Sequence, residues 1–330
     1  MPANLTPQYL QAEEDYRRAA SPEDQLACLQ VMLREIPKHK GTEKLQADLK
    51  RRISETKKEL AADRRAGRRA RGVRIPRQGA GTAILLGGPN AGKSRLLATL
   101  THAAPEVAAY PFTTHVPAPG MMPWEDIMIQ LVDTPPITAE HMDPYTPGLI
   151  RSADLALLMV NLGSDDGIEQ CQDVIDRLNQ IKTRLGRESR VDDEDPGLCY
   201  KQTFLVPNKI DLPAAAERLE LLHELVPLDF REYVISAQEG TGLAELRRAI
   251  YDAIDVVRVY TKHPSAKEAD LDRPFTVRRG STLLELAGQV HKDYLEGLRF
   301  ARVWGDAVHA GTVVKGDYVL RDKDIVELHM

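Results

Sequence analysis

The sequence predicts an α/β protein. Its central domain is expected to hold a doubly wound, mostly parallel sheet, between an N-terminal helical region and a small C-terminal α+β unit. Short apolar runs alternate with amphipathic stretches from about residue 81 to 258. Continuous apolar strands separated by helices are typical of a parallel sheet covered on both faces. No strand pattern precedes residue 79, and from about residue 272 short strands surround one helix. We therefore expect three regions, at 1–78, 79–258 and 270–330.

The N-terminal region is expected to form helices and to end in a basic arm. Leu26, Leu29 and Leu33 make an apolar stripe that Pro37 ends, and a second helix is expected from near Thr42. Between residues 50 and 77 there are twelve basic and three acidic residues, in a chain of net charge −5. Such segregation favours a polyanionic partner, RNA or the ribosome, over the alternative of a solvated helix face.

The central region shows five strand candidates and four helix candidates. The strands are "TAILLGG", "IMIQLVD", "DLALLMVNL", "QTFLVPN" and "EYVISA". The helices follow Lys93 and cover about 168–185, 213–225 and 241–257, with a polar loop at 186–201. In the last region, "RPFTV", "FARVWG" and "DIVELHM" read as strands and "TLLELAGQVHKDY" as one helix.

The composition favours a soluble cytoplasmic protein without membrane contact. The longest apolar runs, such as "LALLMV", are too short to span a bilayer, and the first residues lack the pattern of a secretory signal. Cys28, Cys171 and Cys199 share no spacing typical of a metal site or a disulfide framework.

The segment "GGPNAGKS" carries the strongest chemical signal. It matches G-x-x-x-x-G-K-[ST], follows an apolar strand and opens a helix, which is the context that a phosphate-binding loop requires. Backbone N–H groups of such a loop surround phosphates, the lysine reaches the β- and γ-phosphates, and the hydroxyl binds Mg²⁺. The candidate residues are Gly87, Pro89, Asn90, Ala91, Gly92, Lys93 and Ser94.

The segment "PNKID" ends a later strand and supplies a candidate base-reading site. Asn208, Lys209 and Asp211 have the N-K-x-D spacing, and "SAQEGTGL" follows, with Ser236 and Ala237 placed to close over a base. A carboxylate at Asp211 would accept from the N1–H and N2–H groups of guanine, whereas adenine would leave it unpaired. The order of the motifs favours a guanine nucleotide, GTP or GDP.

The segment "DTPPI" places Asp133 and Thr134 at the end of a strand, where the carboxylate would hold the Mg²⁺ shell through water. The usual pattern is D-x-x-G, in which the glycine N–H bonds the γ-phosphate. Pro136 has no N–H, and the apolar Ile137 follows where a water-orienting glutamine is expected. The sequence therefore predicts slow intrinsic hydrolysis of the nucleotide and the loss of one N–H contact that senses the γ-phosphate.

Together, "GGPNAGKS", "YPFTTHVP", "DTPP", "NKID" and "SAQEGTGL" resemble the motifs of Obg-type GTPases. The flanking segments "PKHKGTEKLQADLKRRISE" and "RPFTVRRGSTLLELAGQVHKDYLEGLRFARVWG" are similar to developmentally regulated GTP-binding (DRG) proteins. The resemblance implies a P-loop NTPase G domain, followed by a TGS domain with a ubiquitin-like β-grasp fold.

The resemblance also implies roles for single residues. Thr114 would bind Mg²⁺, with Phe112 and Thr113 in the same switch, and Asn90 would help to hold a K⁺ ion. Ile137 is ordinary for this family, whereas Pro136 departs from its D-x-P-G pattern. Lys93, Thr114 and Asp133 are the residues expected to carry catalysis.

The leading interpretation is a slow GTPase that uses Mg²⁺. Its basic arm and TGS domain would contact a ribosome or RNA, and a ribosomal component or accessory protein would complete the site. Two alternatives stay open. One is an RNA adaptor that binds GTP or GDP without hydrolysis because Pro136 has broken the switch, and the other is an ATPase.

Overall fold

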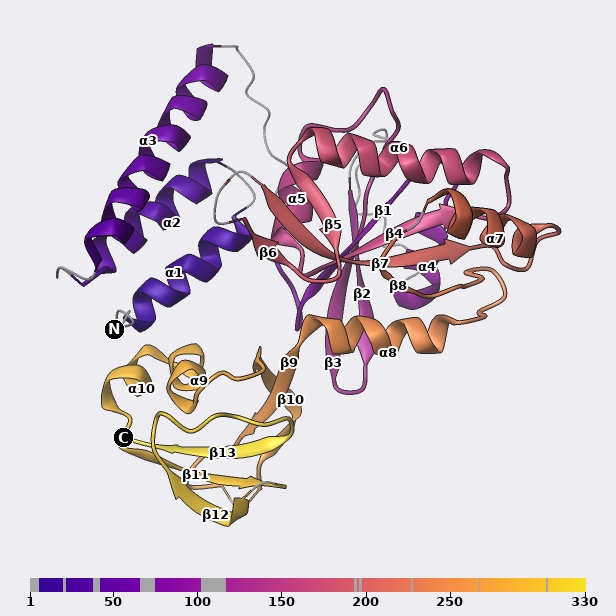
Figure 1. The fold of residues 1–330 in the computed structure, drawn as a ribbon. Coiled ribbons are helices and arrows are strands. Elements are labelled where there is room, and N and C mark those ends of the chain that lie inside the picture. Colours follow the sequence, from indigo (N-terminus) through magenta and orange to yellow (C-terminus); the bar gives the residue numbers. More distant parts are fainter. Residues whose placement is uncertain are drawn as a thin grey trace.

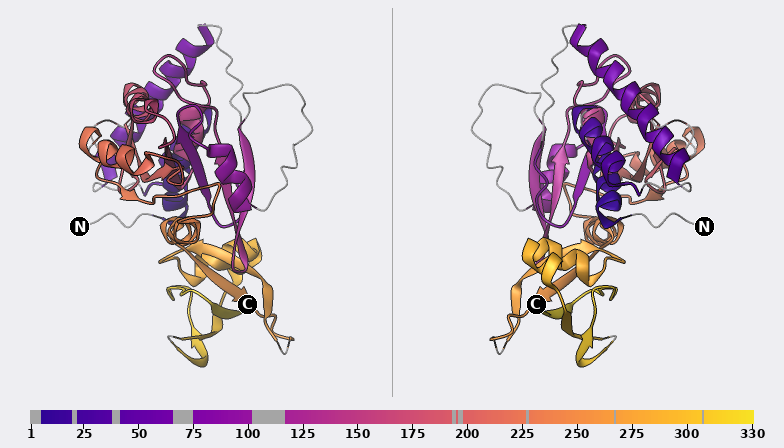
Figure 2. Two further views of the ribbon diagram at one scale, coloured as in Figure 1. Left: turned by 90° about the vertical axis from the view of Figure 1, so that its right-hand side faces the viewer. Right: turned by 90° about the vertical axis from the view of Figure 1, so that its left-hand side faces the viewer.

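The computed structural model describes residues 6–19, 22–37, 42–65, 75–101, 117–192, 195, 198–226, 228–266, 268–306 and 308–330. Figure 1 shows three groups of elements along the chain, and Figure 2 shows the N-terminal helices against one side of the central domain, with the C-terminal domain at its end. None of the described helices combines the length and the apolar character needed to cross a membrane.

The described part of the N-terminal region contains three helices, α1 (Pro7–Arg18), α2 (Pro22–Glu35) and α3 (Glu43–Arg65). Thr6 caps α1, because its hydroxyl accepts a hydrogen bond from Tyr9 N, and the same hydroxyl donates to Glu35 O at the end of α2. The three helices share a small core that includes Tyr9, Leu29 and Leu49. The part of the predicted basic arm at 66–74 lies outside the described residues.

The central domain is built on a mostly parallel sheet, as the sequence predicts. The strand order is β2-β3-β1-β4-β7-β5, with β6 and β8 also paired to β7. Among the described strands of this sheet, β2 and β6 run antiparallel to their neighbours and the others run parallel. The strands are β1 (Thr82–Gly87), β2 (Ala118–Trp124), β3 (Ile127–Asp133), β4 (Leu155–Asn161), β5 (Thr183–Gly186), β6 (Arg190–Val191), β7 (Cys199–Asn208) and β8 (Arg231–Glu232).

Helices cover both faces of this sheet, so the domain has two apolar cores. One core joins the sheet to α4 (Lys93–Thr101) and α8 (Leu243–Ile254). The other joins it to α5 (Thr146–Ser152), α6 (Asp166–Gln180) and α7 (Ala215–Leu225). Strands β1 and β4 are buried along their whole length, which explains their uninterrupted apolar sequences.

Several element boundaries differ from the sequence prediction. Strand β2 was not predicted because it contains Pro119 and Pro123, which an edge strand tolerates. Helix α6 ends at Gln180, before the predicted end at 185, because Lys182 adopts a left-handed conformation (φ 57°) and turns the chain into β5. The predicted polar loop at 186–201 contains β6 and the first residues of β7, and the predicted strand at 232–237 is reduced to β8 and an isolated bridge at Ile235.

The C-terminal domain is a mixed five-stranded sheet with the order β10-β9-β13-β11-β12. Its strands are β9 (Val256–Thr261), β10 (Asp270–Arg278), β11 (Phe300–Gly305), β12 (Val308–Val314) and β13 (Asp324–His329), and its helices are α9 (Leu283–Val290) and α10 (Lys292–Gly297). The sequence predicts a single helix where the structure has α9 and α10. The chain breaks at His291, which is extended (φ −164°) and caps α10 by accepting from Asp293 N.

Strand β9 covers residues expected at the end of the central region and in the connector before residue 270. Asp255 ends α8 in a left-handed conformation (φ 54°), and β9 starts at the next residue. Val257 and Val259 are buried in the core of the C-terminal domain, so β9 belongs to that sheet.

A charged cluster joins the two domains. The side chain of Arg258 in β9 is only 4% exposed, and its guanidinium binds Asp322 in its own domain at 2.6 Å. It also binds Glu125 at 2.5 Å and Asp126 at 2.8 Å, both in the β2–β3 hairpin of the central domain. Asp126 accepts a further hydrogen bond from the Tyr260 hydroxyl. The hairpin is therefore held to the C-terminal domain by hydrogen-bonded charges.

Candidate nucleotide-binding site

The phosphate-binding loop lies between β1 and α4, at the carboxyl edge of the parallel sheet, where ligands of such sheets bind. Three of its residues have positive φ: Gly87 (154°), Asn90 (56°) and Gly92 (90°). A Cβ on Gly92 would lie 2.3 Å from Asn208 Nδ2, so the close approach of two loops requires this glycine. The side chain of Asn90 is exposed.

Lys93 begins α4 and is 7% exposed. Its Nζ donates to Gly87 O at 3.0 Å and to Gly88 O at 2.9 Å, so the ammonium group lies inside the loop. Burial lowers the pKa of Lys93 to about 8, against the opposing effect of the Asp133 carboxylate. An anionic phosphate beside this group would raise this pKa again, because it favours the charged form.

Ser94 and Asp133 lie together beside the loop. Ser94 Oγ donates to Asp133 Oδ2 at 2.5 Å. Asp133 Oδ1 is buried and has no hydrogen-bond partner in the described part of the chain. Burial raises the pKa of Asp133, although the bonds from Ser94 and Thr134 and the charge of Lys93 lower it in part.

These oxygens fit Mg²⁺, which binds one or two protein oxygens and completes its octahedral shell with water and substrate phosphates. The orphaned Asp133 Oδ1 gives the pair an acceptor that water or a metal would satisfy. Among the described residues no group of three or more His, Cys, Asp or Glu could hold a metal. A site that relies on ligand phosphates does not need such a group.

In the segment after Asp133, the side chains of Thr134 and Ile137 do not point into the phosphate-binding loop. Thr134 is 3% exposed and its hydroxyl donates to Leu85 O in β1, so only its backbone is available to a nucleotide. Pro136 is exposed. Ile137 is 1% exposed in the core beneath the sheet, and its N–H donates to Gly87 O at 3.2 Å.

Asn208 connects the phosphate loop to the candidate base-reading loops. Its side chain is buried, Nδ2 donates to Ala91 O at 2.9 Å, and Oδ1 accepts from Ala237 N at 3.0 Å. Asp211 is exposed in the turn after β7, while Lys209 adopts a positive φ of 72°. The structure thus gives Asn208 a positioning role and leaves the Asp211 carboxylate accessible.

The third predicted loop is also ordered by local bonds. Ser236 Oγ accepts from Glu239 N at 2.9 Å, and Ser236 N donates to Thr241 O. Phe112, Thr113 and Thr114 lie outside the described residues, so their placement stays a prediction. The structure brings the other predicted segments to one edge of the sheet.

Two further residues border this site and were not found from the sequence. The Thr99 hydroxyl donates to Ala237 O at 3.2 Å and so ties α4 to the base-reading side. Gln170 in α6 lies against Gly88, and its Oε1 is buried without a partner in the described chain. Neither belongs to a motif, and their roles depend on which helix faces pack on the loops.

Comparisons with known proteins divide the chain in the same way. Residues 82–190 match the model of a family described as 50S ribosome-binding GTPase. Residues 257–330 match the model of the TGS domain, which includes β9 in that domain.

Relatives of known sequence extend along most of the chain. An uncharacterised GTP-binding protein of Methanocaldococcus jannaschii is 29% identical over 93% of this chain and 92% of its own length. Developmentally-regulated G-protein 2 of Arabidopsis thaliana is 25% identical over 88% of this chain and 87% of its own length. Ribosome-interacting GTPase 1 of Saccharomyces cerevisiae is 25% identical over 92% of this chain and 98% of its own length.

Among solved structures, the YchF GTPase of Schizosaccharomyces pombe is similar in fold. The match has a TM-score of 0.52 and 14% sequence identity, and covers 77% of this chain and 99% of that chain. At this identity the likeness concerns the arrangement of the elements alone.

Proposed function

We propose that this chain is an Obg-type GTPase of the DRG-like kind with a C-terminal TGS domain, and that it binds GTP with Mg²⁺ and hydrolyses it slowly to GDP and phosphate. One observation carries the proposal. The phosphate loop, the Ser94–Asp133 pair and the Asn208–Asp211 segment meet at a single edge of the sheet, with Asn208 bonded to both sides.

The protein's contribution to hydrolysis is positioning and charge. Lys93 would exchange the carbonyls of Gly87 and Gly88 for phosphate oxygens, and the loop N–H groups would fix the phosphate chain. Ser94 and Thr114 would bind Mg²⁺ directly and Asp133 through water. When bound, the ion neutralises charge on the phosphate oxygens.

No described side chain near the phosphate loop is proposed to orient the attacking water. Ile137 occupies the position of the usual glutamine and is buried in the core, which supports a low intrinsic rate. We propose that K⁺ held by Asn90 supplies part of the missing positive charge, because that side chain is exposed at the loop and its backbone is left-handed. Equal hydrolysis rates in K⁺ and Na⁺ would show this part to be wrong.

The ribosome or its RNA is the proposed partner. The description of the family matched by residues 82–190 and the name of the yeast relative support this choice, as does the basic composition of residues 50–77. A cytoplasmic location is proposed on the same grounds.

The test is release of phosphate from GTP over many turnovers, with and without ribosomes. We expect slow release that ribosomes accelerate and that Lys93→Ala abolishes. Nucleotide preference is measured separately by competition between GTP and ATP for the bound state. If the wild type hydrolyses GTP no faster than Lys93→Ala does, the proposed GTPase activity is wrong. If the wild type binds ATP as tightly as GTP or more tightly, the proposed guanine selectivity is wrong.

A second candidate is an adaptor that binds GTP or GDP without hydrolysis. Two observations favour it: Pro136 offers no N–H to a γ-phosphate, and the next N–H, of Ile137, is already bonded to Gly87 O. This candidate predicts similar affinities for GDP and a non-hydrolysable GTP analogue, and no phosphate release even with ribosomes.

A further inference from the structure

A cavity lies where the three regions of the chain meet. It has a volume of about 380 Å³, within the range of small-molecule sites. Its walls come from the end of α1, the turn before β4, the β6–β7 edge, and the α8–β9 and β10 ends. Figure 1 shows these elements converging below α5.

The lining is strongly cationic. Seven of the lining side chains are basic and three are acidic. The basic residues are Arg17, Arg18, Arg151, Arg190, Lys201, Arg278 and Arg279. They come from the N-terminal, central and C-terminal regions, so the excess positive charge exists only where the regions are assembled.

Ion pairs within the described part of the chain neutralise only part of this charge. Glu13 pairs with Arg17 and Asp255 with Arg279. A single carboxylate, Glu14, serves two guanidinium groups, at 2.9 Å from Arg18 and 2.5 Å from Arg278. Arg18 Nε is buried without a hydrogen-bond partner among the described atoms. Arg190 lies over the Tyr200 ring, 4.3 Å from its centroid, and forms no ion pair within the described part of the chain.

Hydrogen bonds from Lys201 cross the floor of the cavity. Lys201 in β7 is 5% exposed and donates from Nζ to Ala153 O at 2.5 Å and to Arg151 O at 3.3 Å, which ties the sheet to the end of α5. Burial lowers the pKa of Lys201, so anionic groups beside it would favour its charged form.

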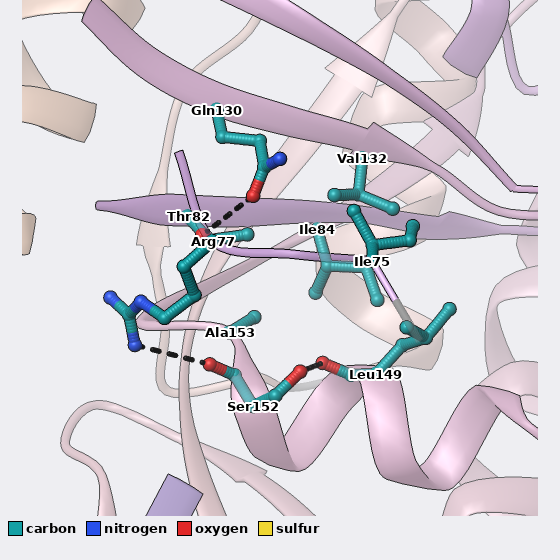
Figure 3. A pocket seen from close by; sticks show the side chains of 9 residues that line it. All are labelled: Ile75, Arg77, Thr82, Ile84, Gln130, Val132, Leu149, Ser152 and Ala153. Carbon is teal, nitrogen blue, oxygen red and sulfur yellow. Dashed lines mark hydrogen bonds between the residues drawn. The ribbon is translucent and has the colours of Figure 1, made fainter. Parts of the chain in front are cut away.

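The basic arm enters the central domain beside this cavity. Arg77, the last residue of the arm, forms an ion pair with Asp154, which lines the cavity. Figure 3 shows the Arg77 guanidinium directed toward Ser152 and away from a separate pocket lined by apolar side chains such as Ile75 and Leu149. That pocket measures about 10 Å³, room for about one water, so it is not a ligand site.

We propose that the cationic cavity at the junction of α1, β7 and β10 binds an anion that carries several phosphate groups, and that this anion holds the three regions together. Guanidinium groups pair with phosphate through two parallel hydrogen bonds, and several of them around one cavity match a polyphosphate better than a single carboxylate.

This site is separate from the nucleotide site. The cavity is at the amino edge of the parallel sheet, beside the residues that precede β4, whereas the phosphate loop is at the carboxyl edge, after Gly87. The six residues of β1 put the two edges on the order of 20 Å apart. One ligand the size of a nucleotide cannot fill both.

The test measures binding of inorganic tripolyphosphate by calorimetry to protein saturated with GDP at fixed free Mg²⁺, so that the phosphate loop is already filled. We expect saturable binding that weakens as salt rises. The double variant Arg190→Gln/Arg278→Gln should weaken it by about tenfold or more. Arg248→Gln, on an exposed part of α8 outside the cavity, is the matched control and should bind as the wild type does.

The affinity of each variant for GDP shows that the central domain is folded, because the nucleotide site shares no residue with the cavity. Absence of saturable tripolyphosphate binding by the wild type, or equal binding by the double variant and the wild type, overturns the proposal. A labelled RNA hairpin identifies the source of the phosphates. If tripolyphosphate displaces it and the double variant loses it, the ligand is RNA; if only tripolyphosphate binding changes, the ligand is a small polyphosphate.

Discussion

Replacement of Asn208 by alanine should weaken nucleotide binding more than it weakens folding. The side chain is buried and forms two hydrogen bonds, one to the phosphate loop at Ala91 O and one from the candidate base-reading loop at Ala237 N. Asn208→Ala leaves both backbone groups buried without a partner, because Ala91 and Ala237 are 1% and 3% exposed. The two loops then lose their only described side-chain link through β7.

The magnitude follows from these two groups. A buried donor or acceptor left unsatisfied costs roughly 1–3 kcal/mol, so the pair costs about 2–6 kcal/mol, less whatever relaxation recovers. Part of this appears as lower stability. The part that reflects loop disorder appears in binding, since the nucleotide must then order the loops itself. We expect the affinity for GDP to fall by about tenfold to a hundredfold, which corresponds to about 1.4–2.8 kcal/mol.

Asn161→Ala is the matched control. Asn161 is the partner of Asn208 in the β4–β7 register and is 6% exposed, but its Oδ1 accepts only from Gly163 N in its own turn. Unfolding in urea is followed by Trp124 fluorescence in a Trp304→Phe background, and affinity by a fluorescent GDP. The reasoning fails if the two variants lose stability alike and both keep GDP affinity within about twofold of the parent.

Two further predictions concern the core and the domain junction. Ile137→Gln should not accelerate hydrolysis, and should lower the thermal midpoint, because it buries an amide in an apolar core at a cost of about 2 kcal/mol or more; faster phosphate release would contradict this. Arg258→Gln should destabilise the junction by about 3 kcal/mol at neutral pH. Hydrogen bonds and charge from Arg258 hold the pKa of Glu125 below its ordinary value, against burial. Burial raises the pKa values of Asp126 and Asp322, but hydrogen bonds and charge from Arg258, with a hydrogen bond from Tyr260 at Asp126, hold both pKa values below their ordinary values. Their contribution is therefore present above the unfolded pKa near 4 and is lost as pH falls below it, so melting curves of variant and parent should converge in acid.

The parts of the fold that could be predicted from the sequence are those whose structure is determined by residues within one short segment. The loop before Lys93 is such a segment, because a strand, glycines and a helix start occur together. The buried strands β1 and β4 are another, since only a sheet covered on both faces explains their continuous apolar sequence.

The parts that were not predicted depend on contacts between distant residues. Strand β2 is stable despite two prolines because it lies at the edge of the sheet, a fact of topology. Helix α8 ends because Asp255 adopts a left-handed conformation, and no glycine in the sequence marks this position. The bridge made by Asn208 and the shared carboxylate of Glu14 likewise join segments far apart in the sequence.

The position of Ile137 limits how a bound nucleotide could change the segment after β3. Gly87 O accepts from both Lys93 Nζ and Ile137 N, so when Lys93 turns to a phosphate the second bond still holds the segment after β3. Burial of the Ile137 side chain stabilises this segment by roughly 2 kcal/mol more. A γ-phosphate therefore has little means of ordering this segment through Pro136. Strand β3 offers another route, because it begins beside the hairpin that binds Arg258 and ends at Asp133. Asp126→Asn should then loosen the C-terminal domain and also change the affinity for GDP, and an unchanged GDP affinity would refute this route.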